Sequence, residues 1–333
     1  MPLPRRVLNL SLSDNSDGEV CLHESLRDES GSYICLSHCW GGVTALQTTR
    51  SNLQARKLGI SRDDVPQTFR DAIFVTQGWA YNISGSTVFA SYKMTSRTGR
   101  SKPLSCAQSN RNASLTVAAT RCQDSTGALF PPFQRTVNSF DGAGVPITVA
   151  LHVRSPHLDM QVTGSRYPLL ERGWFFQERL LSRGVVHFGY DETFWECMTC
   201  SDCECQCLDM RGGSILDPPL KSILHWNSTK APPISQQEVW HRLVGEHTDL
   251  SLTYPTDREI AIMGLVGEMR PYSKGLYLRG LWQDSIISDL AWMDSVPAPA
   301  RSKRGPTWSW CNVDTCCHYL LNSVCAGDVK FLG

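Results

Sequence analysis

The segment from Tyr167 to Cys197 places the strongest constraint on the fold, because it predicts a helix, a stop and a strand in close succession. Pro168 suits the first turn of a helix, where its missing N–H is not needed. The apolar residues that follow recur at three- and four-residue spacing, which indicates one buried helical face. Gly184 can adopt the left-handed conformation that ends a helix. Residues 185–188 then predict a short strand.

Polar side chains gather on this predicted helix, beside a tryptophan. They are Arg172, Gln177, Glu178 and Arg179. Such a group could form a polar functional site, or it could be the solvated face of a capped amphipathic helix. The pattern alone favours the amphipathic helix, because most surface helices have one charged face.

Composition narrows the classes of protein that this chain can belong to. The 32 basic and 32 acidic residues give no net charge, which argues against a dedicated nucleic-acid binder. No apolar run is long enough to cross a bilayer, and the N-terminus lacks the apolar core of a secretory signal. Fourteen cysteines without such a signal indicate reduced thiols. We therefore expect a cytoplasmic protein with no membrane span and no nucleic-acid partner.

A short apolar run at residues 33–37, followed by Gly41 and Gly42, predicts a buried strand that ends in a tight turn. His38 and Cys39 follow the strand at its carboxyl end, where open α/β sheets commonly bind ligands. Adjacent strand residues point to opposite faces, so the two are poorly placed to act as a nucleophile and base. The sequence therefore gives a Cys–His hydrolase little support.

A helix is predicted to begin near Pro66, which suits a first helical turn, with Asp64 as its cap. Phe69, Ile73 and Thr76 are expected to face inward, since they recur at helical spacing.

Several short motifs, met in a fixed order, resemble the fungal heterokaryon incompatibility (HET) domain family. They are residues 33–41 (YICLSHCWG), 66–73 (PQTFRDAI), 127–130 (GALF), 170–174 (LERGW), 177–182 (QERLLS), 187–189 (HFG), 195–197 (WEC), 252–258 (LTYPTDR) and 306–310 (PTWSW). His38 stands where a tyrosine is common in the family. The resemblance covers about residues 33–79, 111–198 and 237–312.

The resemblance implies a fold, a function and a division of the chain. The fold is α/β, with a mainly parallel sheet flanked by helices, distantly TIR-like, and a mostly helical C-terminal region. The function is non-self recognition and programmed cell death signalling in a fungus, through other proteins or self-oligomerisation. The implied segments are an N-terminal leader (1–32), a HET domain (33–200), a Cys-rich and Pro/Gly linker (201–236), a helical region (237–312) and a tail (313–333).

An enzymatic alternative follows from the same resemblance. Some TIR domains cleave NAD, so NAD is a candidate substrate here, although no Gly-rich nucleotide-binding or Walker loop occurs. The candidate catalytic residues are Glu178, Arg172 and His38, and Glu178 is the motif carboxylate to substitute first.

Residues 80–110 depart from the family, which has an apolar strand ending in Trp-Ile-Asp and then an acidic helix at this point. The present segment is polar, has no periodicity and predicts a disordered loop. Read from the third base of its first codon, one permitted choice of codons yields LQYLWIDSLCIIQDDKQDWEIEASIMRSI, which resembles the missing block. We infer two compensating frame changes, from a gene-model error or gene decay. A chain that lost these apolar residues would fold poorly and could be inactive.

A cluster of cysteines follows the Trp-Glu-Cys motif. Its members are Cys197, Cys200, Cys203, Cys205 and Cys207. Two thiolates at Cys-x-x-Cys spacing can hold half of a tetrahedral zinc site, so a zinc-stabilised binding module is an alternative. No second well-spaced pair occurs, and reduced thiols on a polar loop are the favoured interpretation.

Overall fold

The computed structural model describes most of the chain as two compact units, each treated by itself. The described residues are 1–10, 20–42, 48–80, 88–90, 103–130, 136–150, 167–204, 220–225, 234–295 and 305–319. The first unit comprises Met1–Gly99, Asn112–Leu170 and Ser182–Arg211, and the second comprises Arg100–Arg111, Glu171–Leu181 and Gly212–Gly333.

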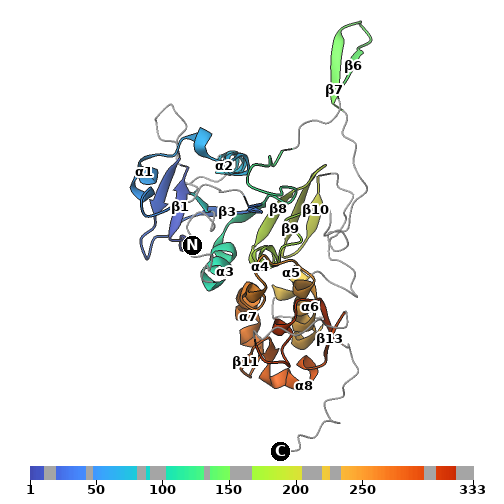
Figure 1. The fold of residues 1–333 in the computed structure, drawn as a ribbon. Helices are drawn as coiled ribbons and strands as arrows, with labels where there is room; N and C mark the ends of the chain where they lie inside the picture. The colour runs from blue at the N-terminus through green and yellow to red at the C-terminus, as the bar shows by residue number, and fades with distance from the viewer. Residues whose placement is uncertain are drawn as a thin grey trace, which may run out of the picture. The chain divides into compact units, whose positions relative to one another are not determined.

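A mixed sheet forms the first unit (Figure 1). Within the described residues it has eight strands in the order β10-β9-β8-β5-β3-β4-β1-β2. The strands are β1 (Arg6–Asn9), β2 (Cys21–Glu24), β3 (Tyr33–Ser37), β4 (Val88–Ala90), β5 (Leu115–Ala118), β8 (Gly184–Phe188), β9 (Thr193–Cys197) and β10 (Ser201–Cys203). The central strands β4, β3, β5 and β8 pair in parallel. Both edges pair antiparallel, so the sheet is mixed rather than mainly parallel.

The motif strands at residues 33–37 and 184–188 lie in one sheet, with β5 between them. Every residue of β3 and β5 is buried, which agrees with the predicted buried strand at 33–37. Strands covered on both faces need apolar residues at successive positions, and this is why the run is continuous rather than alternating.

Helix α2 (Gln67–Ala80) provides one side of the core of this unit. Its residues Phe69 and Ile73 pack in one cluster with Ile34, Val117 and Phe188 of three parallel strands. The predicted inward positions are confirmed, since Phe69, Ile73 and Thr76 are all buried.

The helix of the signature segment begins later than the sequence predicts. Helix α4 spans Gly173–Leu181, while Pro168 lies in the turn that precedes it. The turn is fixed by the backbone hydrogen bond from Leu170 N–H to the carbonyl of Tyr167.

Gly184 does not end a helix in the left-handed conformation; it is the first residue of β8. A Cβ at this position would lie 2.5 Å from the indole Cη2 of Trp195 on the neighbouring strand. The glycine is therefore required by close packing of a ring, which the sequence alone does not reveal.

The prediction of a loop at residues 80–110 is wrong for two described pieces. Residues 88–90 form strand β4, and helix α3 spans Pro103–Asn112; residues 81–87 and 91–102 lie outside the described residues. The buried face of α3 is made of Cys106, Ala107 and Asn110. These side chains are small or polar, so they leave little hydrophobic periodicity in the sequence.

Shorter elements complete the first unit. They are α1 (Leu53–Leu58), the 3-10 helix η1 (Arg62–Asp64), and the hairpin of β6 (Thr136–Phe140) and β7 (Pro146–Ala150). The residue expected to cap α2, Asp64, belongs to η1 instead.

Among its described residues, the second unit contains short helices and two small antiparallel sheets. Besides most of α3 and α4, its elements are α5 (Leu220–Leu224), α6 (Gln236–Thr248), η4 (Pro255–Asp257), η5 (Ile260–Ile262), α7 (Met263–Met269), η6 (Arg270–Tyr272), β11 (Tyr277–Leu278), β12 (Leu281–Trp282), η7 (Gln283–Ser285), α8 (Ile286–Asp289), β13 (Trp292–Asp294), η8 (Trp310–Asn312) and β14 (Cys317–Tyr319). In the two sheets, β11 pairs with β12 and β13 pairs with β14. Helix α6 begins with a capping box, in which Ser235 and Glu238 bond each other's backbone N–H.

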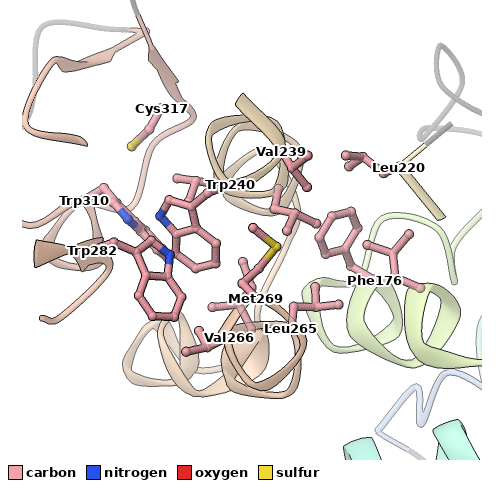
Figure 2. Packing of buried hydrophobic residues seen from close by; sticks show 14 of the residues in the cluster. Phe176, Leu220, Val239, Trp240, Leu265, Val266, Met269, Trp282, Trp310 and Cys317 are labelled. Atoms are coloured by element: carbon pink, nitrogen blue, oxygen red, sulfur yellow. The ribbon is translucent and has the colours of Figure 1, made fainter. Parts of the chain in front are cut away.

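Tryptophans fill the core of this unit (Figure 2). Trp240, Trp282 and Trp310 lie together in Figure 2, and Phe176 of α4 packs in the same cluster. The indole N–H groups of Trp240 and Trp310 both donate to the carbonyl of Gly280, at 3.0 and 2.8 Å. Trp240, Trp282 and Trp310 are therefore core residues of this unit.

Among the described residues, no helix has both the length and the apolar character that a membrane crossing requires.

Candidate functional site

The carboxyl ends of three parallel strands bring motif residues together in the first unit. Ser37 of β3 is paired with Ala118 of β5, which is paired in turn with His187 of β8. In parallel α/β sheets this edge is where ligands usually bind.

His38 follows β3 directly and is fully buried. Its ring contacts Phe69 edge-on, with ring centroids 4.8 Å apart, and lies 5.9 Å from the ring of Trp40. These contacts are those of an imidazole packed among aromatic rings.

Sequence reasoning missed a buried hydrogen-bonded group of three side chains: His187 of β8, Glu196 of β9 and Thr120, which follows β5. Nδ1 of His187 lies 3.1 Å from the hydroxyl of Thr120, and Nε2 lies 3.3 Å from a carboxylate oxygen of Glu196. A proton on Nε2 lets the imidazole donate to the carboxylate and accept from the hydroxyl.

The register of β8 and β9 explains why His187 and Glu196 meet. His187 is opposite Phe194, so Glu196 is the diagonal neighbour of His187 on the same face of the sheet. The only sequence signal is that His187 and Glu196 occupy buried-face positions of two adjacent apolar runs, which a hairpin register can align.

Two loops meet at this edge through a glycine. Gly41 has φ +60°, and a Cβ there would lie 2.1 Å from Cβ of Asp124 in the loop after β5. The hydroxyl of Thr68 on α2 donates to the carbonyl of Gly127, at 2.6 Å. The carboxylate of Asp71 accepts a hydrogen bond from the N–H of Leu129, at 2.8 Å. Side chains of α2 therefore fix the loop after β5.

The three candidate catalytic residues are divided between the units: His38 belongs to the first, and Arg172 and Glu178 belong to the second. Arg172 precedes α4 and donates to the hydroxyl of Thr253, at 3.4 Å. Glu178 is buried on α4, with the thiol of Cys106 3.8 Å from its carboxylate. Within the second unit, Glu178 thus has the surroundings of a packed carboxyl group.

Gln177, a neighbour of Glu178, has a defined structural role. Its side-chain oxygen accepts a hydrogen bond from the backbone N–H of Gly264 at the start of α7, at 2.5 Å. The signature helix is therefore tied to a later helix through a motif glutamine.

The described part of the cysteine cluster lies on a hairpin of the first unit. The sulfurs of Cys197 and Cys200 are 3.4 Å apart, Cys203 is buried, and Cys205 and Cys207 lie outside the described residues. No group of three or more potential metal ligands occurs within the described ranges.

The two neighbouring thiols of this hairpin differ in acidity. Burial opposes ionisation of Cys197, but hydrogen bonds from the hydroxyl and N–H of Thr199 and from Cys200 lower its pKa to about 7. The hydrogen bond between Cys200 and Cys197 is the main cause that raises the pKa of Cys200, and burial is the second.

A hollow of about 510 Å³ opens in the second unit, between α6 and β14. His241 stacks on Tyr319 with ring centroids 3.7 Å apart and bonds Asp289 at 2.8 Å. The sulfur of Cys316 lies 3.6 Å from Nε2 of His318. Burial raises the pKa of Cys316, which disfavours the reactive thiolate form of this thiol.

No protein-family model matches this chain. Neither a comparison with curated proteins nor one with solved structures finds a significant match.

Proposed function

We propose that this chain is a fungal HET-domain protein, which signals programmed cell death when non-self is sensed. The observation that carries the proposal is the convergence of distant motifs in one unit. Strands β3 and β8 share a sheet with β5 between them, and the loop of Gly41 packs against that of Asp124. Unrelated chance matches to motifs would have no reason to converge at one edge of a sheet.

The finer features of the family belong to the same proposal. Four parallel strands with α2 against one face support a TIR-like arrangement. Helices α6 and α7 support a helical C-terminal region over residues 237–312. Self-oligomerisation or another protein would then be the trigger of signalling.

The inferred frame change has support from helix α3. This helix ends at Asn112, with two residues between it and β5, where the family resemblance calls for the acidic helix. A helix in this position built from small and polar residues has little apolar surface to bury. The restored sequence would supply the missing apolar side chains.

The decisive experiment expresses two chains in a fungal host and scores cell death. One, the stated chain, has the present sequence, and the other, the restored chain, carries the alternative reading of residues 80–110. We expect the restored chain to kill and the stated chain not to. Equal toxicity would refute the inferred frame change, and no toxicity from either chain would count against the proposed function.

Two glycine variants of the restored chain test the convergence of the motifs. Gly41 and Gly42 both have positive φ, but only a Cβ on Gly41 would strike Asp124; no atom lies within 4 Å of a Cβ on Gly42. Gly41→Ala should abolish killing, while Gly42→Ala should retain it. Full activity of Gly41→Ala would mean that the contact between the two loops is irrelevant to signalling.

The burial of Glu178 beside Cys106 favours signalling over NAD cleavage, because a catalytic carboxylate has to reach its substrate. Purified restored protein incubated with NAD should release no nicotinamide. Release that Glu178→Gln abolishes would favour the hydrolase instead.

A further inference from the structure

The hairpin of β9 and β10 holds two cysteines face to face. Ser201 is paired with Glu196, so the next pair toward the turn is Cys200 with Cys197. The N–H of Cys197 donates to the carbonyl of Cys200, at 2.9 Å, which confirms that the two residues are opposite each other. Only Met198 and Thr199 separate them.

This pairing is close to the geometry of a disulfide. Opposite residues that share a backbone hydrogen bond in antiparallel strands have Cα atoms about 5.5 Å apart. A disulfide needs about 4.4–6.8 Å between the Cα atoms and about 3.5–4.5 Å between the Cβ atoms. Opposite residues have Cβ atoms about 4.5–5.5 Å apart, so closing the bond draws the two strands slightly together near the turn. The sulfurs are 3.4 Å apart, and small rotations about the two Cα–Cβ bonds would bring them together.

The surroundings of the pair suit exchange with an external reagent. Both side chains are partly exposed, so a small molecule can reach them. The hydroxyl of Thr199 lies 3.4 Å from the sulfur of Cys197. By contrast, Cys203 on the same hairpin is buried and is paired with Phe194 rather than with another cysteine.

We propose that Cys197 and Cys200 form a reversible dithiol–disulfide site that reacts with small-molecule disulfides. The sulfur of Cys197 attacks the disulfide co-reactant, forms a mixed disulfide and releases one thiol. The sulfur of Cys200 then attacks that of Cys197, which closes the intramolecular bond and releases the second thiol. Two protein thiols are oxidised, one external disulfide is reduced to two thiols, and the two thiol protons pass to the released thiols.

The closed bond would add a covalent link at one edge of the sheet. Cys197 is also paired with Gly184, the first residue of β8, so the crosslinked hairpin is directly adjacent to the parallel centre. The site is independent of the proposed signalling function and can be tested without it.

The test incubates the full chain with oxidised glutathione, blocks the remaining thiols with an alkylating reagent and maps the crosslinks by mass spectrometry. We expect a Cys197–Cys200 disulfide that dithiothreitol reverses. Cys200→Ser should stop at glutathione bound to Cys197, and Cys197→Ser should lose the crosslink. Cys316→Ser, which removes a thiol of the second unit, is the matched control and should retain it.

Three results would overturn the proposal. Glutathione could remain on Cys197 of the native chain with Cys200 still free. The crosslink of Cys197 could form mainly with Cys203, Cys205 or Cys207. Purified protein could also carry stoichiometric zinc that either single substitution releases and that prevents oxidation, which would make the pair a metal site.

Discussion

The side-chain oxygen of Gln177 on α4 accepts a hydrogen bond from the backbone N–H of Gly264, 2.5 Å away at the start of α7. A Cβ on Gly264 would lie 2.6 Å from that oxygen and 2.5 Å from Cβ of Ala107 on α3. One glycine therefore allows three helices of the second unit to approach closely.

Replacing Gly264 by alanine should destabilise the protein by about 1–3 kcal/mol, because the added methyl group overpacks this contact. Gly267→Ala on the same helix is the matched control, since no atom lies within 4 Å of a Cβ there. That change should stabilise by about 0.5–1 kcal/mol through helix propensity. Urea unfolding measures both, and equal effects of the two changes would show that the close approach is unimportant.

The two tryptophans of the motif at residues 306–310 should differ in their contribution to stability. Trp310 is fully buried and donates to the carbonyl of Gly280, whereas the side chain of Trp308 is 42% exposed. Trp310→Ala should cost about 3–5 kcal/mol. Trp308→Ala should cost less than about 1 kcal/mol. Thermal unfolding of the two variants compares them, and a reversed order would contradict the packing described for this core.

Removal of the Glu196 carboxylate should take away the hydrogen-bond acceptor that lies 3.3 Å from Nε2 of the buried His187. Glu196→Ala should therefore destabilise by about 1–3 kcal/mol. Glu196→Gln keeps an acceptor of similar shape and should cost less. The free energy of unfolding in urea distinguishes the two, and an alanine variant as stable as the native chain would mean that the pair contributes nothing to folding.

His247 should make the protein less stable in acid. Burial, together with the charge of Arg258, lowers the pKa of His247 to about 4, against an opposing hydrogen bond to the carbonyl of Arg258. In the unfolded chain, His247 binds a proton as the pH falls below the ordinary histidine pKa of about 6.5. In the folded chain, it binds this proton only near pH 4. The contribution of neutral His247 to the free energy of unfolding is therefore complete above about pH 6.5. It falls by roughly 2–3 kcal/mol as the pH drops toward 4.

The measurement is the free energy of unfolding at several values between pH 4 and pH 7. His247→Gln should flatten this dependence, even if it lowers stability overall. His318→Gln, a change at an exposed histidine of the same unit, is the control and should retain the slope. A slope that survives in His247→Gln would assign the acid sensitivity to other groups.

Local sequence determined the parts of the fold that depend on continuous apolar patterns. The buried strand at residues 33–37 and the inward face of α2 both follow from runs and spacings within about fifteen residues. Such segments must bury their apolar surface in any compact fold, so their positions can be predicted without partners.

Tertiary structure alone decided the features that depend on a partner distant in the sequence. Gly184 marks contact with a ring on the next strand, His187 finds Glu196 through the register of two strands, and α3 forms from small and polar residues that carry no periodic pattern. Each of these is set by which atoms the fold brings within a few ångströms, and a sequence pattern records only the type of residue and its spacing.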